Sequence, residues 1–280
     1  MLKSIFKYFL KKNIHLKNKY YNQTCYLFGN GSSLNKFSLK FFSKSYTFSC
    51  NWMLLHRDYK ILENNIGYTL STPFFFSPFF KNPYTKKIKI NLAGKFFLKN
   101  FNFKKNNLFT SIANYPFLFF KPNVYYMHDF GDKSLSIKNF DLTNCFSLMS
   151  SALYSMIGIT KYLGFKKIVL IGMDYLYDQP FYGHFYETNI DLPVDTEESS
   201  FKEKRKKDII FFNEVQKEIE LILLTPQESE CSFIKTINYS DYFSTKEEKF
   251  TNLNTVSIDN LNVLDKLGYK YNIFYDNNFR

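Results

Sequence analysis

The chain has 280 residues, is 45% hydrophobic and carries a formal net charge of +12. This length suits one large α/β domain or one domain with insertions, and the apolar fraction is ample for a core. No stretch approaches the roughly 20 consecutive apolar residues of a transmembrane helix. The four cysteines are dispersed without a CxxC pair, which indicates buried, reduced thiols and neither a zinc site nor a disulfide framework.

The basic charge has two interpretations. Phe, Tyr, Lys, Asn and Ile all have A/T-rich codons, so the 34 Phe and 22 Tyr residues are consistent with a biased genome. Alternatively, the charge attracts an anionic partner, such as a membrane surface, a nucleic acid or a phosphorylated substrate. The basic residues are spread along the chain and no nucleic-acid-binding signature occurs, so we expect no nucleic-acid partner.

Residues 1–23 are a basic segment that we predict to begin with an amphipathic helix. Apolar residues fall at helical spacing and lysines occupy the remaining face: Leu2, Ile5, Phe6, Phe9 and Leu10 against Lys3, Lys7, Lys11 and Lys12. Such a helix is suited to lying on an anionic bilayer, which would place the protein in the cytoplasm, peripheral to the inner membrane. The alternative is a helix that packs on the domain and exposes its lysines to water.

The next part of the chain alternates between strand and turn signals. We predict the following elements: strands at 24–29, 46–50, 66–71, 86–93 and 123–128, and a helix at 34–42. Residues 95–122 give no clear prediction.

The clearest unit lies at 147–177. We predict a helix at 147–165, which Gly164 ends. A continuous apolar strand follows at 166–177, typical of a strand buried on both faces of a parallel sheet. The predicted fold class is therefore α/β, a Rossmann-like parallel sheet with helices on both faces.

Residues 178–207 lack an apolar period, and a structureless stretch of this length indicates a lid, which we start at about residue 176. A helix at 208–220 and a strand at 221–225 follow. The predicted organisation has three parts: the basic segment 1–23, a Rossmann-like domain at 24–237, and a C-terminal appendage at 238–280 with a helix at 257–268.

The first candidate site is the loop Gly29-Asn30-Gly31-Ser32-Ser33, which follows the first strand. Backbone amides and hydroxyls at the start of a helix suit a phosphate group, and a plain turn is the alternative. The loop is not a dinucleotide fingerprint, because Leu34 stands where the third glycine would be. It is not a P-loop either, because no Gly-Lys-Ser/Thr follows.

Two further strand ends lie at the same carboxyl edge of the predicted sheet. Asn51 follows the second strand, where its amide could contact a base or ribose or simply form a turn. Gly172 and Asp174 end the strand at 166–177, where Asp174 could accept a hydroxyl or hold the local turn. Beyond them, Tyr177 and Tyr182 offer phenols for a phosphate.

His184 lies in the predicted lid, where an imidazole is a natural general base, although an ordinary surface histidine is the alternative. Carboxylates that could hold magnesium are available in this region, but their spacing is not diagnostic, and we expect no metal site.

In this order, the segments "CYLFGNGSSL", "FSCNW", "SSALYSMIGITKYLGFKKIVLIGMDYLY" and "DIIFFNEVQKEIELILLTP" resemble the sialyltransferases of glycosyltransferase family 42 over residues 24–235. They are also similar to related bacterial transferases of nonulosonic acids that modify flagellin. The resemblance implies one Rossmann-like domain with a lid, a CMP-activated sugar as donor substrate, and no metal or other cofactor.

The resemblance also implies roles for the candidate residues. Asn30 and Gly31 would contact the phosphate and ribose of CMP, with Ser32 and Ser33 nearby. Asn51 would contact the nucleotide, and Ser151 matches a hydroxyl that holds the donor.

Tyr177 or Tyr182 matches the phenols that bind the leaving phosphate. Glu203 falls at or near the place of the family's catalytic histidine, whereas His184 lies about twenty residues upstream, so either side chain is a candidate base. Met149 and Leu153 replace an arginine and a glycine of the family, and Leu176 replaces a phenol.

The function predicted from these patterns is an inverting, metal-independent transfer of sialic acid, or a related ulosonic acid, from a CMP-activated donor. The acceptor would be a bacterial surface glycan or glycolipid, and a homo-oligomer is compatible with the sequence. The alternatives are a phosphate-transfer or pyrophosphokinase-like enzyme of the same superfold, and a basic protein that binds membrane or nucleic acid.

Overall fold

A computed structural model gives the structure of the chain. It describes the following residues: 2–79, 91–128, 140–149, 151–186, 192–193, 196–226, 229–244, 256 and 259. Among the helices it describes, none is both long and apolar enough to cross a bilayer.

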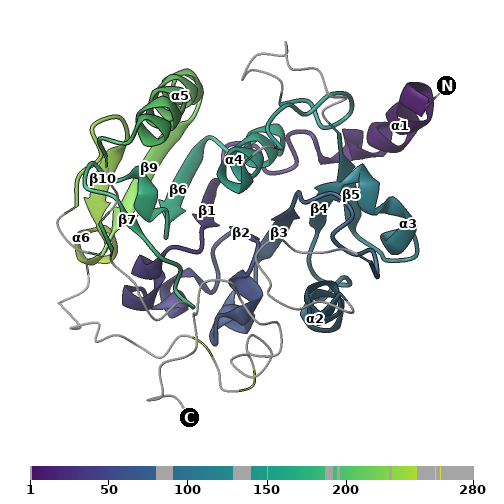
Figure 1. The fold of residues 1–280 in the computed structure, drawn as a ribbon, viewed down its shortest axis with the longest axis horizontal. Helices are drawn as coiled ribbons and strands as arrows, with labels where there is room; N and C mark the ends of the chain where they lie inside the picture. The colour runs from purple at the N-terminus through teal and green to yellow at the C-terminus, as the bar shows by residue number, and fades with distance from the viewer. Residues whose placement is uncertain are drawn as a thin grey trace.

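The centre of the molecule is an eight-stranded sheet in the order β10-β9-β6-β1-β2-β3-β4-β5 (Figure 1). Its strands are β1 (Thr24–Phe28), β2 (Thr47–Cys50), β3 (Asn65–Leu70), β4 (Leu108–Ser111), β5 (Val124–Met127), β6 (Lys167–Ile171), β9 (Glu220–Thr225) and β10 (Lys235–Asn238). Every neighbouring pair is parallel. The predicted α/β class with a Rossmann-like parallel sheet is confirmed.

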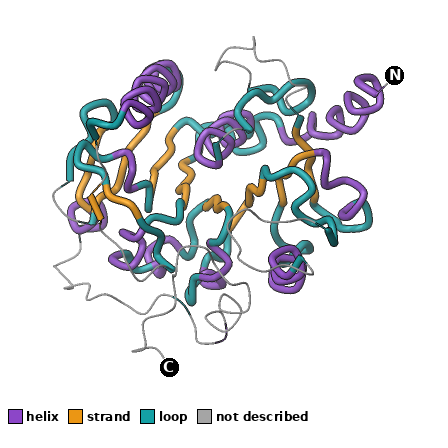
Figure 2. Tube along the Cα trace, viewed as in Figure 1, coloured by secondary structure: helices purple, strands orange, loops and turns teal. Residues whose placement is uncertain are grey.

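Helices cover both faces of this sheet (Figure 2). One face carries α4 (Ala152–Tyr162) and α5 (Ser199–Gln216), and the other carries α2 (Leu92–Asn100), α6 (Tyr239–Phe243) and several short 3-10 turns. The helices α1 (Leu2–Lys11) and α3 (Tyr115–Leu118) lie at the end of the sheet beside β5. The strands β7 (Phe181–Tyr182) and β8 (Leu192–Pro193) form a separate antiparallel pair.

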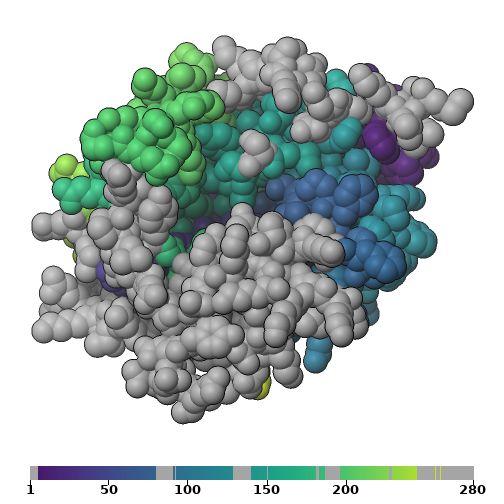
Figure 3. Space-filling view, in the orientation of Figure 1, coloured from purple at the N-terminus to yellow at the C-terminus, as the bar shows by residue number. Residues whose placement is uncertain are grey.

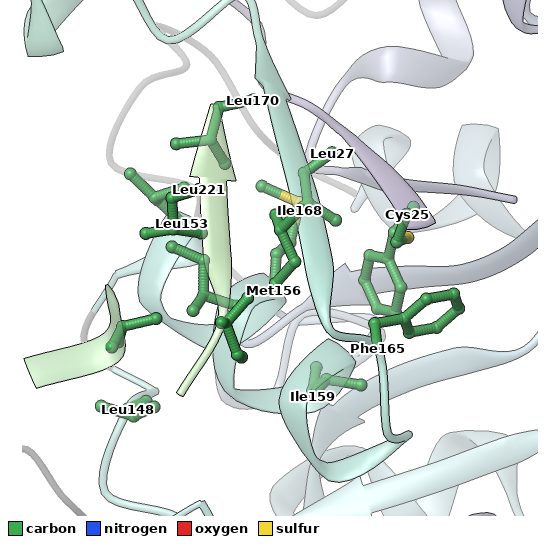
Figure 4. Packing of buried hydrophobic residues seen from close by; sticks show 14 of the residues in the cluster. Cys25, Leu27, Leu148, Leu153, Met156, Ile159, Phe165, Ile168, Leu170 and Leu221 are labelled. Carbon is green, nitrogen blue, oxygen red and sulfur yellow. The ribbon is translucent and has the colours of Figure 1, made fainter. Parts of the chain in front are cut away.

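The sheet divides most of the apolar core into two clusters, one on each face, and a small third cluster around Leu10 joins α1 to the end of the sheet. Figure 4 shows the face under α4, where Leu153 and Met156 of the helix pack towards Leu27 and Ile168 of the strands. All four side chains are at most 3% exposed, and burying such a side chain contributes roughly 1.5–3 kcal/mol. Gly164 ends the α4 segment as predicted, with a φ of +94° that favours glycine.

Several predicted elements differ in the structure, and the strand predicted at 166–177 ends at Ile171. Residues 34–42 form no α-helix but two 3-10 turns, Ser32–Lys36 and Leu39–Phe42. These turns direct all their apolar side chains except Phe41, which is 38% exposed, into the core. The strand predicted at 86–93 is wrong where the structure describes it, since the Asn91 side chain accepts a hydrogen bond from the Gly94 N–H at 2.8 Å and caps α2. Residues 86–90 lie outside the described residues.

The helix predicted at 208–220 begins nine residues earlier, at Ser199. Part of the predicted lid, 199–207, is therefore the first half of α5. The charged residues of this half gave no apolar signal because most of their side chains face water. Glu203 and Lys207, one helical turn apart, form an ion pair there at 2.7 Å. Residues 95–122, which gave no prediction, contain most of α2, all of β4 and α3. Most of the helix predicted at 257–268 lies outside the described residues.

The strand order contains a topological switch beside β1. The chain adds β2, β3, β4 and β5 outwards on one side of β1, and then returns to place β6, β9 and β10 on the other side. The carboxyl ends of β6, β1 and β2 are consequently neighbours. In open parallel sheets, ligands bind at the carboxyl edge at such a switch.

Candidate functional site

The glycine loop after β1 is held tightly against the end of β6. The Gly29 N–H donates to the Ile171 carbonyl at 2.8 Å, and the Gly31 N–H donates to the Gly172 carbonyl at 2.9 Å. A Cβ atom at Gly31 would lie 2.5 Å from Cγ of Asp174, which is closer than real side chains approach. Glycine is therefore required at position 31 because a carboxyl group occupies the adjoining space.

The Asp174 carboxylate holds this loop. Its Oδ2 accepts the Ser33 backbone N–H at 2.8 Å and the Ser32 hydroxyl at 3.2 Å, and its Oδ1 accepts the Ser33 hydroxyl. Asp174 is only 3% exposed, and hydrogen bonds to a buried carboxylate are strong. These hydrogen bonds tie the Asp174 carboxylate to the turn that follows β1.

Tyr177 lies behind the same loop and is 1% exposed. Burial raises its pKa, and the Asp174 carboxylate adds to that rise, while a hydrogen bond with Ser33 works against it. The phenol is therefore protonated at neutral pH. The structure brings Tyr177, Ser33 and Asp174 together as the support of the loop.

Asn30 occupies the centre of the switch point with an unsatisfied atom. Its Nδ2 lies 3.4 Å from the Cys50 carbonyl and 3.6 Å from the Cys50 sulfur. Its buried Oδ1 has no hydrogen-bond partner among the residues that the structure describes. Buried polar atoms without a partner are uncommon in native proteins and call for a specific explanation. A ligand with a hydrogen-bond donor would supply the missing partner.

Asn51 and Ser151 belong to the same edge of the sheet. Asn51 has a left-handed φ of +49°, which asparagine tolerates, and its carbonyl accepts the Tyr68 hydroxyl at 2.6 Å. Ser151 precedes α4 and makes no side-chain capping bond. Because α4 follows β5 and leads back to β6 while packing on β2 and β3, its positive N-terminal end faces the carboxyl edge.

His184 is brought to the glycine loop by backbone pairing. Gly31 and His184 form an antiparallel bridge, and the Phe185 N–H donates to the Asn30 carbonyl at 3.0 Å. The imidazole is half-buried and stacks on the Tyr186 ring at a centroid distance of 5.0 Å. A positive φ of +121° at Gly183 turns the chain immediately before it.

The other candidate base is placed differently. The Glu203 side chain is 69% exposed on α5 and pairs with Lys207. The hydrogen bond and positive charge of Lys207 lower the pKa of Glu203, which makes it a weaker base. For Tyr182 the structure describes the backbone, which belongs to β7.

Sequence reasoning missed the role of Arg205. Its guanidinium donates to the carbonyls of Leu176 at 2.9 Å and Tyr177 at 2.6 Å, and it lies 3.3 Å from the Asp178 carboxylate. Arg205 thereby ties α5 to the segment that continues from Asp174. It belongs to the basic run "KEKRKK", and nothing in that run distinguishes it from its solvated neighbours.

Metal ligands are not clustered in the described part of the chain, where no group of three or more His, Cys, Asp or Glu side chains is arranged to hold an ion.

No family model and no curated protein matches the sequence. Among solved structures, the chain is similar to the sialyltransferase CstII from Campylobacter jejuni in complex with a substrate analogue, cytidine-5'-monophosphate. The identity is 17%, the match covers 88% of this chain and 99% of that one, and the TM-score is 0.45.

A second similar structure is the sialyltransferase CST-II in complex with a trisaccharide acceptor and CMP. Its identity is 16%, its coverage is 88% of this chain and 100% of that one, and its TM-score is 0.43. At this level the similarity concerns the arrangement of elements and not the reaction.

Proposed function

We propose that the protein is a glycosyltransferase that moves sialic acid, or a related ulosonic acid, from a CMP-activated donor to a glycan acceptor. The donor would bind where β6, β1 and β2 end. The observation that carries this proposal is the unpartnered Oδ1 of Asn30, buried at the topological switch point beside the glycine loop. The ordered sequence motifs over residues 24–235 support the choice of CMP as the nucleotide.

The proposed recognition of the donor follows from hydrogen-bond chemistry. An amide oxygen is an acceptor, so Asn30 Oδ1 would receive a ribose hydroxyl or the cytosine amino group rather than the phosphate. The phosphate would lie towards Ser151, because the N-terminal end of α4 carries partial positive charge. Asn51 would complete the nucleotide contacts from β2.

The proposed reaction is a direct displacement. The acceptor hydroxyl oxygen attacks the anomeric carbon, the bond from that carbon to the phosphate oxygen breaks, and CMP leaves with the electron pair. His184 would take the proton of the acceptor hydroxyl. The α4 N-terminus and loop amides would stabilise the charge that grows on the phosphate.

His184 is the better base for two reasons. Its backbone is bridged to Gly31 and its ring stacks on Tyr186, which supports a position for the imidazole beside the donor loop. Glu203, by contrast, faces water and is engaged with Lys207.

Differential scanning fluorimetry with CMP, CDP, UDP, GDP, ATP and NAD tests the proposal. We expect CMP to raise the unfolding temperature selectively, since a ligand at 100 times its Kd adds about 2.7 kcal/mol of stability. Asn30→Ala should abolish this shift. The exposed Asn22 provides a matched control, and Asn22→Ala should keep it. A selective shift with ATP or NAD, or no shift with any nucleotide, would overturn the proposal.

A further inference from the structure

Charge is divided unevenly along the chain. Residues 1–128 contain 20 Lys and Arg side chains and only two acidic ones, Asp58 and Glu63, which gives a net charge of +18. Residues 129–280 contain 17 basic and 23 acidic side chains, a net charge of −6. The positive part comprises β1 to β5 with α1, α2 and α3. This half of the molecule is therefore suited to an anionic partner.

A cavity of about 590 Å³ lies in this positive half, where β3, β4 and β5 end. Its volume falls within the range of small-molecule sites. Most of its walls are apolar, and they include Phe6, Phe9, Phe74, Ile112, Tyr115 and Met149. Among the residues that the structure describes, the polar lining consists of three serine side chains and His128 and includes no acidic side chain.

The amphipathic helix α1 forms one wall of this cavity. Phe9 packs on Tyr115 with ring centroids 4.6 Å apart, and Phe6 meets the His128 ring edge-on at 5.1 Å. Leu10 is fully buried beneath them. The apolar face of α1 is thus used to cover the strand ends, while Lys7 between the two phenylalanines is exposed.

Exposed aromatic side chains occur in the segments that build the cavity. Of the nine large hydrophobic side chains exposed in the described part of the chain, four belong to the segments that build it: Tyr8 at 67%, Phe74 at 56%, Phe119 at 64% and Phe120 at 62%. Figure 3 shows the purple atoms of α1 beside the teal atoms of the neighbouring chain at one end of the molecule.

Lysines accompany these rings. Lys121 lies 5.0 Å from the centre of the Phe120 ring and Lys12 lies 6.0 Å from that of Tyr8. Aromatic side chains interleaved with lysines are typical of surfaces that rest on lipid headgroups.

We propose that this cavity binds the apolar chain of an anionic lipid. The acyl or isoprenoid chain would enter past Phe74, whose exposed ring lines the cavity. The surrounding lysines would attract the anionic headgroup, and each such side chain near a membrane surface contributes about 1 kcal/mol. The net charge of +18 over residues 1–128 and the lack of acidic side chains in the described lining favour this occupant over a cationic or neutral one.

The cavity shares the carboxyl edge of the sheet with the candidate donor site. β3 lies two strands from β1, which corresponds to about 10 Å at a strand spacing of about 4.8 Å. A lipid held in the cavity would therefore carry its headgroup close to the donor sugar. Lipid binding stands without the transferase proposal, whereas the use of that lipid as the acceptor's carrier rests on the proposed function.

Isothermal titration calorimetry with lysophosphatidylglycerol below its micelle concentration tests the proposal, with lysophosphatidylcholine as the neutral comparison. We expect saturable binding that is at least tenfold tighter for the anionic lipid. Ala113→Phe should fill the cavity and weaken binding at least tenfold. Tyr21→Ser changes a side chain that is 65% exposed and lies outside the lining, and it should leave binding of the monomeric lipid unchanged.

A second pair of variants avoids dependence on a core substitution. Phe74→Asp adds a negative charge where the cavity opens, and Ile210→Asp makes a matched change at a side chain that is also 56% exposed, on α5. Only the first should weaken lipid binding. No lipid binding by the unaltered protein, equal affinity for the two lipids, or equal binding by Phe74→Asp and Ile210→Asp would overturn the proposal.

The change in unfolding temperature with CMP is measured on the same protein preparations. Lipid binding without a rise in unfolding temperature in CMP would overturn the proposed function alone. A rise with CMP but no lipid binding would overturn this inference alone.

Discussion

His184 and Gly31 are bridged backbone to backbone, although they stand in opposite halves of the chain. The bridge holds the backbone of His184 beside the loop that ends β1, and the Phe185 N–H bonded to the Asn30 carbonyl at 3.0 Å extends the pairing by one residue. The proposed role of His184 as a base would use this placement, since a group held near the reacting atoms needs little reordering.

The first prediction concerns the two candidate bases. His184→Ala should lower turnover of a CMP-sugar at least a hundredfold, the usual contribution of a general base, and should leave the CMP-induced thermal shift intact. Glu203→Gln should retain nearly full turnover, because that carboxylate faces water beside Lys207. Release of CMP measured by chromatography checks both. Full turnover in His184→Ala would remove the histidine from the mechanism.

The second prediction concerns the contact between Gly31 and Asp174. Gly31→Ala should destabilise the protein by about 1–3 kcal/mol, because the added Cβ would lie 2.5 Å from the carboxyl carbon. Asp174→Ala should also destabilise, by about 1–3 kcal/mol, because it leaves the Ser33 N–H and hydroxyl without their acceptor. Urea unfolding measures each effect.

The double variant provides the test of this contact. Without the Asp174 carboxylate, the Cβ atom at position 31 has room. The double variant should therefore lose at least 1 kcal/mol less free energy of unfolding than the two single variants together. Additivity within about 0.5 kcal/mol would show that the two positions do not interact.

The third prediction concerns the tie between α5 and the chain after Asp174. Arg205→Lys should lower the free energy of unfolding by about 1.5–3 kcal/mol, because an ammonium cannot reproduce the fork that reaches the Leu176 and Tyr177 carbonyls. Lys206→Met, at the exposed neighbouring position, is the control and should change stability little. Equal urea midpoints for the two variants would contradict the assigned role.

The fourth prediction concerns acid sensitivity. His56 is 3% exposed, and burial lowers its pKa from 6.5 to about 4, with Arg57 adding to this and Asp58 opposing it. The folded state therefore keeps the imidazole neutral while the unfolded chain takes up a proton below pH 6.5. Stability is complete above pH 6.5 and falls as the pH drops towards 4, by about 3 kcal/mol in all.

Urea unfolding between pH 7.5 and 4 measures this loss. His56→Gln should flatten that part of the stability profile, whereas His15→Gln, at an exposed position, should preserve it. An unchanged slope in His56→Gln would assign the acid sensitivity to other groups.

The sequence by itself determined the elements whose signal is carried by adjacent residues. The apolar runs of β1, β6 and β9 and the glycine that ends the α4 segment were predictable because each is defined within a few residues. The position of three polar strand ends at one edge was also predictable, since parallel strands share their carboxyl side. By contrast, the start of α5 could not be predicted, because the solvated first half of this helix has no apolar period.

Only the tertiary structure decided which polar atoms meet. In the structure Asp174 accepts hydrogen bonds from Ser32 and Ser33, and the backbone of His184 is bridged to Gly31. The amide oxygen of Asn30 has no hydrogen-bond partner within the described part of the chain. These contacts depend on the order of strands and on crossovers that bring together residues far apart in the chain. Such contacts leave no trace in local periodicity, because each partner alone resembles an ordinary turn or surface residue.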